Sequence, residues 1–196
     1  MSVPVRRGRP GYDLDRLLDV AVTVFNERGY DGTSMEDLAV RLGISKSAIY
    51  HHVSAKAELL RLATDRALDA LEAVVAAPAG DTAIERLEYV VRGSVRVLAE
   101  ELPFVTLLLR VRGNTEAERR ALARRRELDH RLTDLVRAAL AEGSLRPEVD
   151  PALTARLIFG TVNSLIEWYR PSRALRTEDV ADAVVGLVLG GLRRSG

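Results

Sequence analysis

The stretch GISKSAIYHHVSAKAELL, from Gly43 to Leu60, combines an apolar helical pattern with many side chains that donate hydrogen bonds. A core helix would not carry serine, lysine, tyrosine and histidine in close succession, whereas a surface that meets phosphates would. Ser45 is a suitable N-cap for a short helix that ends near His51. Because Gly43 ends the preceding helix, the two helices predict a helix-turn-helix, whose second helix enters the DNA major groove.

The residues before this stretch predict two further helices. From an N-cap at Asp13, apolar residues recur at helical spacing until Gly29 ends the run. The segment TSMEDLAVRLG follows, in which Thr33 and Glu36 fit a capping box. We therefore expect residues 13–55 to form a helix-turn-helix DNA-binding domain.

The rest of the chain predicts helices and no convincing strand or internal repeat. Apolar periodicity and breakers indicate helices near residues 54–77, 81–101, 103–113, 115–142, 151–169 and 177–194. The fold class is therefore all-α, with about nine helices. Residues 56–196 are expected to form a C-terminal helical domain.

Composition narrows the class of protein. The chain has 196 residues, of which 47% are hydrophobic and 29% charged, typical of a globular protein with one or two domains. It contains no cysteine, which excludes disulfides and thiolate metal sites. There is no secretory signal, and the longest apolar segment, residues 180–192, is too short to span a bilayer. We expect a cytoplasmic protein without a membrane partner.

Net charge is only +1, but positive charge gathers at the N-terminus. Arg6, Arg7 and Arg9 precede the first acid, so residues 1–12 form a basic arm. The Arg-Gly-Arg-Pro sequence is narrow enough to enter an A·T-rich minor groove. We expect this arm to contact DNA.

Further DNA contacts are predicted by position on the helices. Thr33 and Ser34 lie at a helix N-terminus, which favours a phosphate. Tyr50, His51 and Lys56 carry donors suited to backbone phosphates. The expected first turn of the recognition helix supplies the candidates for base edges, Lys46, Ser47 and Ala48, and we expect its N-cap, Ser45, to lie at the DNA as well. For any one of these residues, a side chain that simply faces water is a competing interpretation.

Residues 13–60 resemble the DNA-binding signature of the TetR family of bacterial transcriptional regulators. The matching residues are Phe25, Gly29, Tyr30, Thr33, Asp37, Leu38, Ala39, Gly43, Ser45, Tyr50, Lys56, Leu59 and Leu60. Two positions depart from the pattern: Val53 replaces phenylalanine and Ala57 replaces glutamate. Since Ala57 follows Ser54 by three residues, we expect that helix to lack a capping box and to be slightly less stable.

The resemblance implies that the C-terminal domain binds a small molecule and dimerises. We expect the ligand pocket to be lined by Tyr89, Phe104, Leu108, Asn163 and Trp168. For each aromatic residue taken singly, a place in the hydrophobic core is the competing interpretation. Small and apolar residues in the last two helices predict the dimer interface, with Leu157, Gly160, Leu165, Val184, Leu187 and Gly190. Packing of the same residues within one subunit is the alternative.

The segment NSLIEWYRP, residues 163–171, is similar to a branch of the family that responds to acyl-CoA thioesters. In that branch glycines often follow the proline, whereas Ser172 and Arg173 do here. A run of arginines in ERRALARRREL, residues 118–128, could contact CoA phosphates or could form a solvated helix face. A small hydrophobic ligand is expected, with an acyl-CoA thioester as one candidate.

An enzyme is not indicated. His51 and His52 are adjacent and point to different sides of a helix, and His130 has no partner at the spacing of a metal site. No phosphate loop or nucleophile elbow is present, and we expect no cofactor and no metal. The sequence therefore predicts a homodimeric repressor that a small ligand releases from a palindromic DNA operator. A constitutive dimeric DNA-binding protein without an effector is the alternative.

Overall fold

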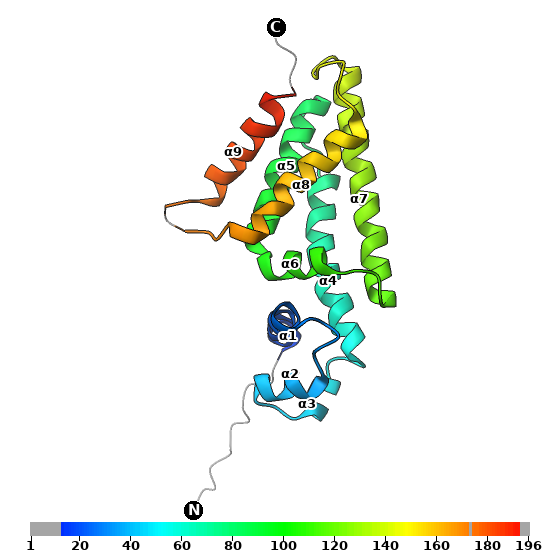
Figure 1. Cartoon of the computed structure of the whole chain (residues 1–196), viewed down its shortest axis with the longest axis vertical. Helices are drawn as coiled ribbons and strands as arrows, with labels where there is room; N and C mark the ends of the chain where they lie inside the picture. Colours follow the sequence, from blue (N-terminus) through cyan, green and yellow to red (C-terminus); the bar gives the residue numbers. More distant parts are fainter. Residues whose placement is uncertain (1–12, 173, 193–196) are drawn as a thin grey trace, which may run out of the picture.

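The computed structural model describes residues 13–172 and 174–192, and nine α-helices account for most of them (Figure 1). Their bounds are α1 Leu14–Arg28, α2 Met35–Leu42, α3 Lys46–Tyr50, α4 Lys56–Ala76, α5 Ala83–Glu100, α6 Leu102–Arg110, α7 Glu116–Ala141, α8 Pro151–Trp168 and α9 Thr177–Gly190. The described residues contain no β-strand. The predicted all-α class is confirmed.

The first three helices form a small domain at one end of the molecule (Figure 1). Gly43 adopts a left-handed conformation at φ 66°, which ends α2 and turns the chain into α3. The predicted capping box at Thr33 and Glu36 is wrong by one residue. Ser34 is the N-cap of α2, and Asp37 completes the box by accepting the Ser34 backbone N–H at 2.8 Å.

The 21-residue helix α4 continues from this domain into the larger helical bundle (Figure 1). Leu59 and Leu60 are buried near its start, where α4 packs against α1. The N-cap, Ala55, has no side-chain hydrogen bond, but Glu58 accepts the Ser54 backbone N–H at 2.6 Å and its hydroxyl at 2.7 Å. Glu58 thus makes the hydrogen bonds that a glutamate at position 57 would make in a capping box, and these bonds offset the expected lower stability of the start of α4.

The remaining helices form the bundle, and α6 lies between it and α1 (Figure 1). Gly93 of α5 faces Val74 of α4 so closely that an added Cβ would lie 2.4 Å from a valine methyl, which fixes glycine there. The last helix, α9, rests mainly on α5. Arg96 donates two hydrogen bonds, of 2.7 and 2.8 Å, to Glu178, and Arg92 forms an ion pair with Asp182.

Within residues 13–172 and 174–192, no helix is long and apolar enough to cross a membrane. In the same ranges, no three histidine, aspartate or glutamate side chains gather in a way that could hold a metal ion.

Candidate nucleic-acid interface and effector cavity

The short helix α3 presents its polar side chains outward on a single buried anchor, Ile49. Ser45 caps the helix, because its hydroxyl accepts the backbone N–H of Ala48 at 3.2 Å and lies 2.9 Å from the hydroxyl of Ser47. Lys46 and Ser47 are exposed, and Ala48 is half-buried. This geometry leaves the first turn of α3 open to a partner, as base readout requires.

The residues predicted to contact phosphates divide into two groups. Tyr50 is 45% exposed and His51 is exposed beside it, so both donors are accessible. Ser34 is exposed, but its hydroxyl donates to Asp37 at 2.6 Å and is therefore occupied in capping. The arm residues Arg6, Arg7 and Arg9 lie outside the described residues.

Thr33 and Lys56, both predicted to contact phosphates, have partners within the protein. Thr33 is buried, and its hydroxyl donates to the carbonyl of Gly29 at 2.8 Å. The ammonium group of Lys56 donates to the carbonyls of Tyr30 and Thr33 at 2.8 and 2.7 Å. It also lies 4.2 Å from the centre of the Tyr30 ring. Both side chains hold the loop between α1 and α2 in place, a role that the sequence did not indicate.

A small cavity of about 40 Å³ lies between α4, α6, α7 and α8. Leu108 and Asn163, both predicted ligand residues, line it together. The other three do not. Phe104 is buried beneath Arg66, whose guanidinium carbon lies 4.2 Å from the ring centre, and Tyr89 and Trp168 are exposed elsewhere. Phe104 therefore contributes to the packing of α4 on α6, and Tyr89 and Trp168 lie at the outer surface.

Charged side chains also line this cavity. Arg125 and Asp129 lie one turn apart on α7 among leucines. Burial lowers the pKa of the Arg125 guanidinium and raises the pKa of the Asp129 carboxyl. The arginine run had suggested phosphate contacts for all five residues, but only Arg125 reaches the cavity.

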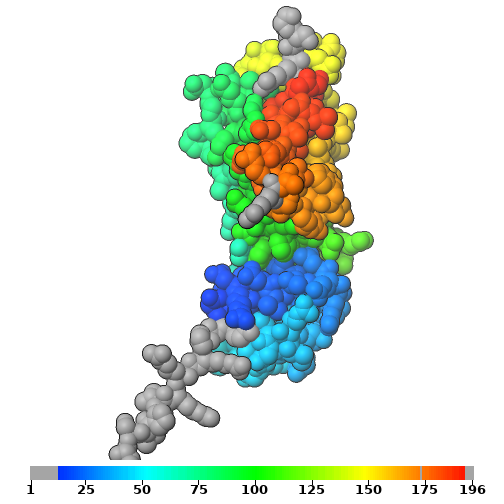
Figure 2. All heavy atoms as spheres, turned by 90° about the vertical axis from the view of Figure 1, so that its left-hand side faces the viewer, coloured from blue at the N-terminus to red at the C-terminus, as the bar shows by residue number. Residues whose placement is uncertain are grey.

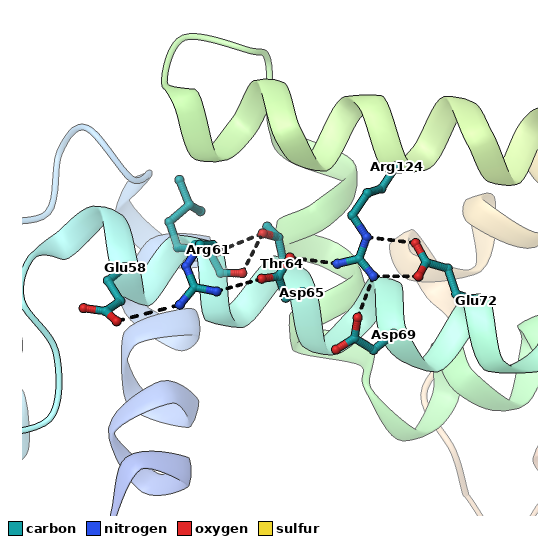
Figure 3. Close-up of polar contacts among 8 residues, drawn as sticks. Glu58, Arg61, Thr64, Asp65, Asp69, Glu72 and Arg124 are labelled. Carbon is teal, nitrogen blue, oxygen red and sulfur yellow. Dashed lines mark hydrogen bonds and ion pairs between the residues drawn. The ribbon is translucent and has the colours of Figure 1, made fainter.

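The neighbouring residue, Arg124, binds three acids on successive turns of α4 (Figure 3). Its guanidinium is 20% exposed and hydrogen-bonds to Glu72, Asp65 and Asp69, with two bonds to Glu72. Asp65 also accepts from Arg61 at 3.0 Å, and Arg61 lies 3.7 Å from Glu58. A chain of ion pairs therefore runs from the N-terminus of α4, beside the DNA-binding domain, to α7. The sequence of α7 alone does not indicate that Arg124 binds to α4, because its three acidic partners lie on that other helix.

A second connection joins α1 to α6. The Asn26 side-chain amide donates to the backbone carbonyl of Pro103 at 2.8 Å, and the backbone carbonyl of Asn26 accepts from the Arg110 guanidinium at 2.9 Å. Arg66 of α4 bonds to Glu101 at 2.8 Å. The DNA-binding domain is thus fixed at both ends of α6.

Helices α8 and α9 lie side by side on one face of the molecule (Figure 2), and several large apolar side chains are exposed on their outer side. Leu157, Trp168 and Leu187 are 62%, 58% and 74% exposed. Two open grooves of about 220 and 330 Å³ run along this face. Among the predicted interface residues, Gly160 and Gly190 are exposed with Leu157 and Leu187. Leu165 and Val184 are buried within their own subunit, and both line the floor of the larger groove.

Comparison with protein families agrees with this geometry. Residues 17–63 match the bacterial regulatory proteins of the tetR family, and residues 80–192 match the tetracyclin repressor-like C-terminal domain. The chain belongs to the TetR family. TetR regulators bind DNA through the domain that α1, α2 and α3 form here, so the helix-turn-helix prediction is confirmed.

Several TetR proteins of similar length are related over nearly the whole chain. The transcriptional repressor KstR2 of Mycolicibacterium smegmatis is 28% identical over 98% of this chain and 96% of its own. The TetR-family regulator SCO3833 of Streptomyces coelicolor is 58% identical, covers 91% of both chains and has a TM-score of 0.85. AibR, solved with isovaleryl coenzyme A and operator DNA, is 27% identical, covers 88% of this chain and 96% of its own, and has a TM-score of 0.75.

Proposed function

We propose that this TetR-family protein is a homodimeric repressor that a small hydrophobic metabolite releases from a palindromic operator. The observation that carries this is the arrangement along α4. One end of the helix holds the DNA-binding domain through Lys56, and the other end lines the cavity through Leu71. A change at the cavity therefore has a continuous, packed element through which it reaches α3.

Dimerisation is proposed from the face of α8 and α9. Exposed leucine and tryptophan side chains beside glycines allow two copies to pack closely, and a patch of this kind is unusual on a monomer. Two recognition helices about 34 Å apart would then contact successive major grooves. Replacement of Leu187 by glutamate should yield monomers in sedimentation experiments, whereas the same change at exposed Val40, on α2, should leave the dimer intact.

Each element of the DNA-binding domain has a proposed role. Lys46, Ser47 and Ala48 would meet base edges, and Tyr50 and His51 would hold backbone phosphates. Ser34 and Ser45 act as helix caps that set the orientation of α2 and α3. The basic arm, with Arg6, Arg7 and Arg9, would add minor-groove contacts.

Release would follow from a change in the distance between the two DNA-binding domains. The effector needs to favour the non-binding arrangement by only a few kcal/mol to empty the operator. The first metabolite class to test is an acyl-CoA thioester, because the neighbour AibR was solved with isovaleryl coenzyme A. A constitutive dimeric DNA-binding protein is the second candidate, favoured by the small volume of the cavity.

Fluorescence anisotropy on the palindrome upstream of the protein's own reading frame tests both candidates. Acyl-CoA thioesters, the matching free acids and common hydrophobic drugs would be titrated into the protein–DNA complex. Release by one compound supports a ligand-responsive repressor. Tight binding that no compound disturbs supports the constitutive protein.

A further inference from the structure

The DNA-binding domain carries more acidic than basic side chains. Residues 13–55 contain seven acids and four bases, so the domain has a net charge of −3 while its histidines are neutral. DNA is a polyanion, and proteins bind it by neutralising phosphates with cations. The source of the cations that meet the operator phosphates therefore needs an explanation.

Three of the four basic side chains already have partners within the protein. Arg28 lies 3.5 Å from the carboxylate of Asp37. Arg41 lies 3.3 Å from the carboxylate of Glu27. Arg16 is engaged as well. A phosphate that approaches one of these guanidinium groups has to compete with the partner that the group already has.

Lys46, at the start of α3, is the exception. It is exposed, and in the part of the chain that the structure describes its ammonium group makes no hydrogen bond or ion pair. The next basic residue, Lys56, donates to two carbonyls of the loop after α1. The described DNA-binding surface therefore offers one unengaged permanent cation per subunit.

Two histidines follow at the other end of α3. His51 is the C-cap of the helix, His52 comes next, and both are exposed. The flanking residues Ile49 and Val53 are 0% and 3% exposed and anchor the pair. The backbone N–H groups of the two histidines donate to carbonyls of α3 at 3.2 and 2.9 Å. The backbone of the pair is therefore fixed, and its imidazole rings lie at the surface.

Both imidazole rings are available to a partner. Within residues 13–172 and 174–192, neither ring makes a hydrogen bond or an ion pair. The charged side chains of α2 and of the first turn of α4 bind other groups, except Glu36, which forms no ion pair with either histidine. These other side chains are Asp37, Arg41, Lys56 and Glu58.

We propose that His51 and His52 bind operator phosphates as imidazolium ions, so that DNA binding takes up protons and tightens as the pH falls from 8 to 6. An imidazole changes its charge in this range, whereas arginine and lysine side chains stay charged. A charged N–H donor also makes a stronger hydrogen bond to a phosphate oxygen than a neutral one does. This inference rests on the proposed function in placing α3 at the DNA, and it adds His52 to the interface.

The two rings change the charge of the interface substantially. In the proposed dimer, four imidazolium ions would join two Lys46 ammonium groups. The arginines of the basic arm keep their charge throughout this pH range, so they add affinity but no pH dependence. The α-amino group of the chain also titrates near neutral pH, and only histidine variants separate its effect from that of the rings.

Fluorescence anisotropy with the operator duplex at pH 6, 7 and 8 measures the effect. The wild-type affinity should rise by about tenfold or more from pH 8 to pH 6. The slope of log K against log salt concentration should steepen over the same range by about 0.9 for each imidazolium that gains a phosphate. The double variant His51→Gln/His52→Gln should lose both effects, and each single variant should lose part of them.

The matched control is His130→Gln, because His130 is the third histidine and is exposed on α7 in the C-terminal domain. It should keep the wild-type pH dependence. All these positions are exposed, so the melting temperatures of the variants should stay close to that of the wild type. Wild-type affinity that does not vary with pH, or a pH dependence that survives in the double variant, would overturn the inference. A loss confined to His51→Gln would remove His52 from the interface.

A duplex of unrelated sequence separates this inference from the proposed function. Phosphate contacts do not depend on sequence, so acid should tighten binding to that duplex too, at low salt. If the protein does not prefer its operator but binds both duplexes more tightly in acid through the two histidines, the repressor function fails and the inference holds. If it binds the operator selectively and equally well at pH 6 and pH 8, the repressor function holds and the inference fails. Binding of neither duplex at any pH would contradict both.

Discussion

Nη1 of Arg124 in α7 lies 2.8 Å from Oδ1 of Asp65 in α4, the helix that carries the DNA-binding domain. Asp65 shares its second oxygen with Arg61, so the contact joins two ion-pair groups into one (Figure 3). Without Arg124, the acids at positions 65, 69 and 72 would repel one another on a single face of α4.

Arg124→Gln should therefore destabilise the protein by roughly 1.5–3 kcal/mol, the usual range for hydrogen bonds to charged groups. Urea unfolding measures the change. The matched control is Arg119→Gln on the same helix, because in the part of the chain that the structure describes the only acid that Arg119 contacts is exposed Glu116, in its own helix. The control should stay within about 0.5 kcal/mol of wild type. Equal losses for the two variants would show that the α4 contacts add nothing specific.

Lys56→Met should lower stability and leave the salt dependence of DNA binding unchanged. The ammonium group stabilises the loop after α1 by binding two carbonyls, so its loss removes one hydrogen bond from each of them. A lysine that contacted phosphate would contribute about 0.9 to the slope of log K against log salt concentration. Anisotropy at several salt concentrations gives this slope. A decrease of that size would restore Lys56 to the DNA interface.

Lys46→Ala and Tyr50→Ala should weaken DNA binding in different ways. Loss of Lys46 should relax discrimination between operator variants by about 1–3 kcal/mol, because a base contact is removed. Loss of Tyr50 should weaken every sequence alike by about 0.5–1.5 kcal/mol, because a phosphate carries no sequence information. Binding to a set of single-base operator variants separates the two effects. Unchanged discrimination in Lys46→Ala would count against base readout.

Stability should fall in acid through the carboxylates that cap α2 and α4. Hydrogen bonds from Ser34 lower the pKa of Asp37, and hydrogen bonds from Ser54 lower the pKa of Glu58. A lowered pKa in the folded state gives stability that is present above the ordinary values, 3.8 and 4.5. That stability is lost as the pH falls through the lowered values. Urea unfolding from pH 7 to pH 2 measures it.

The variant Asp37→Asn/Glu58→Gln supplies the comparison for this pH effect. It should be less stable than wild type at pH 7 and should lose less stability on acidification, because neither replacement titrates. If both proteins lose stability in parallel, the acid sensitivity originates elsewhere.

The sequence predicted the DNA-binding fold well because its signals are local. Capping residues such as Asp13 and Ser45, the glycines that end α1 and α2, and apolar spacing all act within a few residues, so α1 and α3 lie within a residue or two of the predicted bounds. The capping box of α2 was misplaced because Thr33–Glu36 and Ser34–Asp37 both fit the pattern. The choice between them depends on Thr33 being turned inward to Gly29, which is a tertiary contact.

Site residues were predicted less well because their roles depend on distant partners. Lys56 is drawn inward by carbonyls 26 and 23 positions away, and nothing near it in the sequence indicates this. Adjacent Arg124 and Arg125 look alike in the sequence, yet one bonds to α4 and the other enters the cavity. Leu165 and Leu157 are both leucines of α8, so the sequence favours them equally as interface residues. Only the rotation of α8 about its axis decides which of them is exposed.

The attachment of α9 to α5 has a consequence for assembly. The outer face of α9 is apolar. Its inner side is held against α5 partly by the ion pairs of Arg92 and Arg96, which are half-exposed and which dissolved ions weaken. Association through that face should therefore become less favourable at high ionic strength, although the face itself carries few charges. An apolar contact between subunits would then respond to added potassium chloride in the way that an electrostatic contact does.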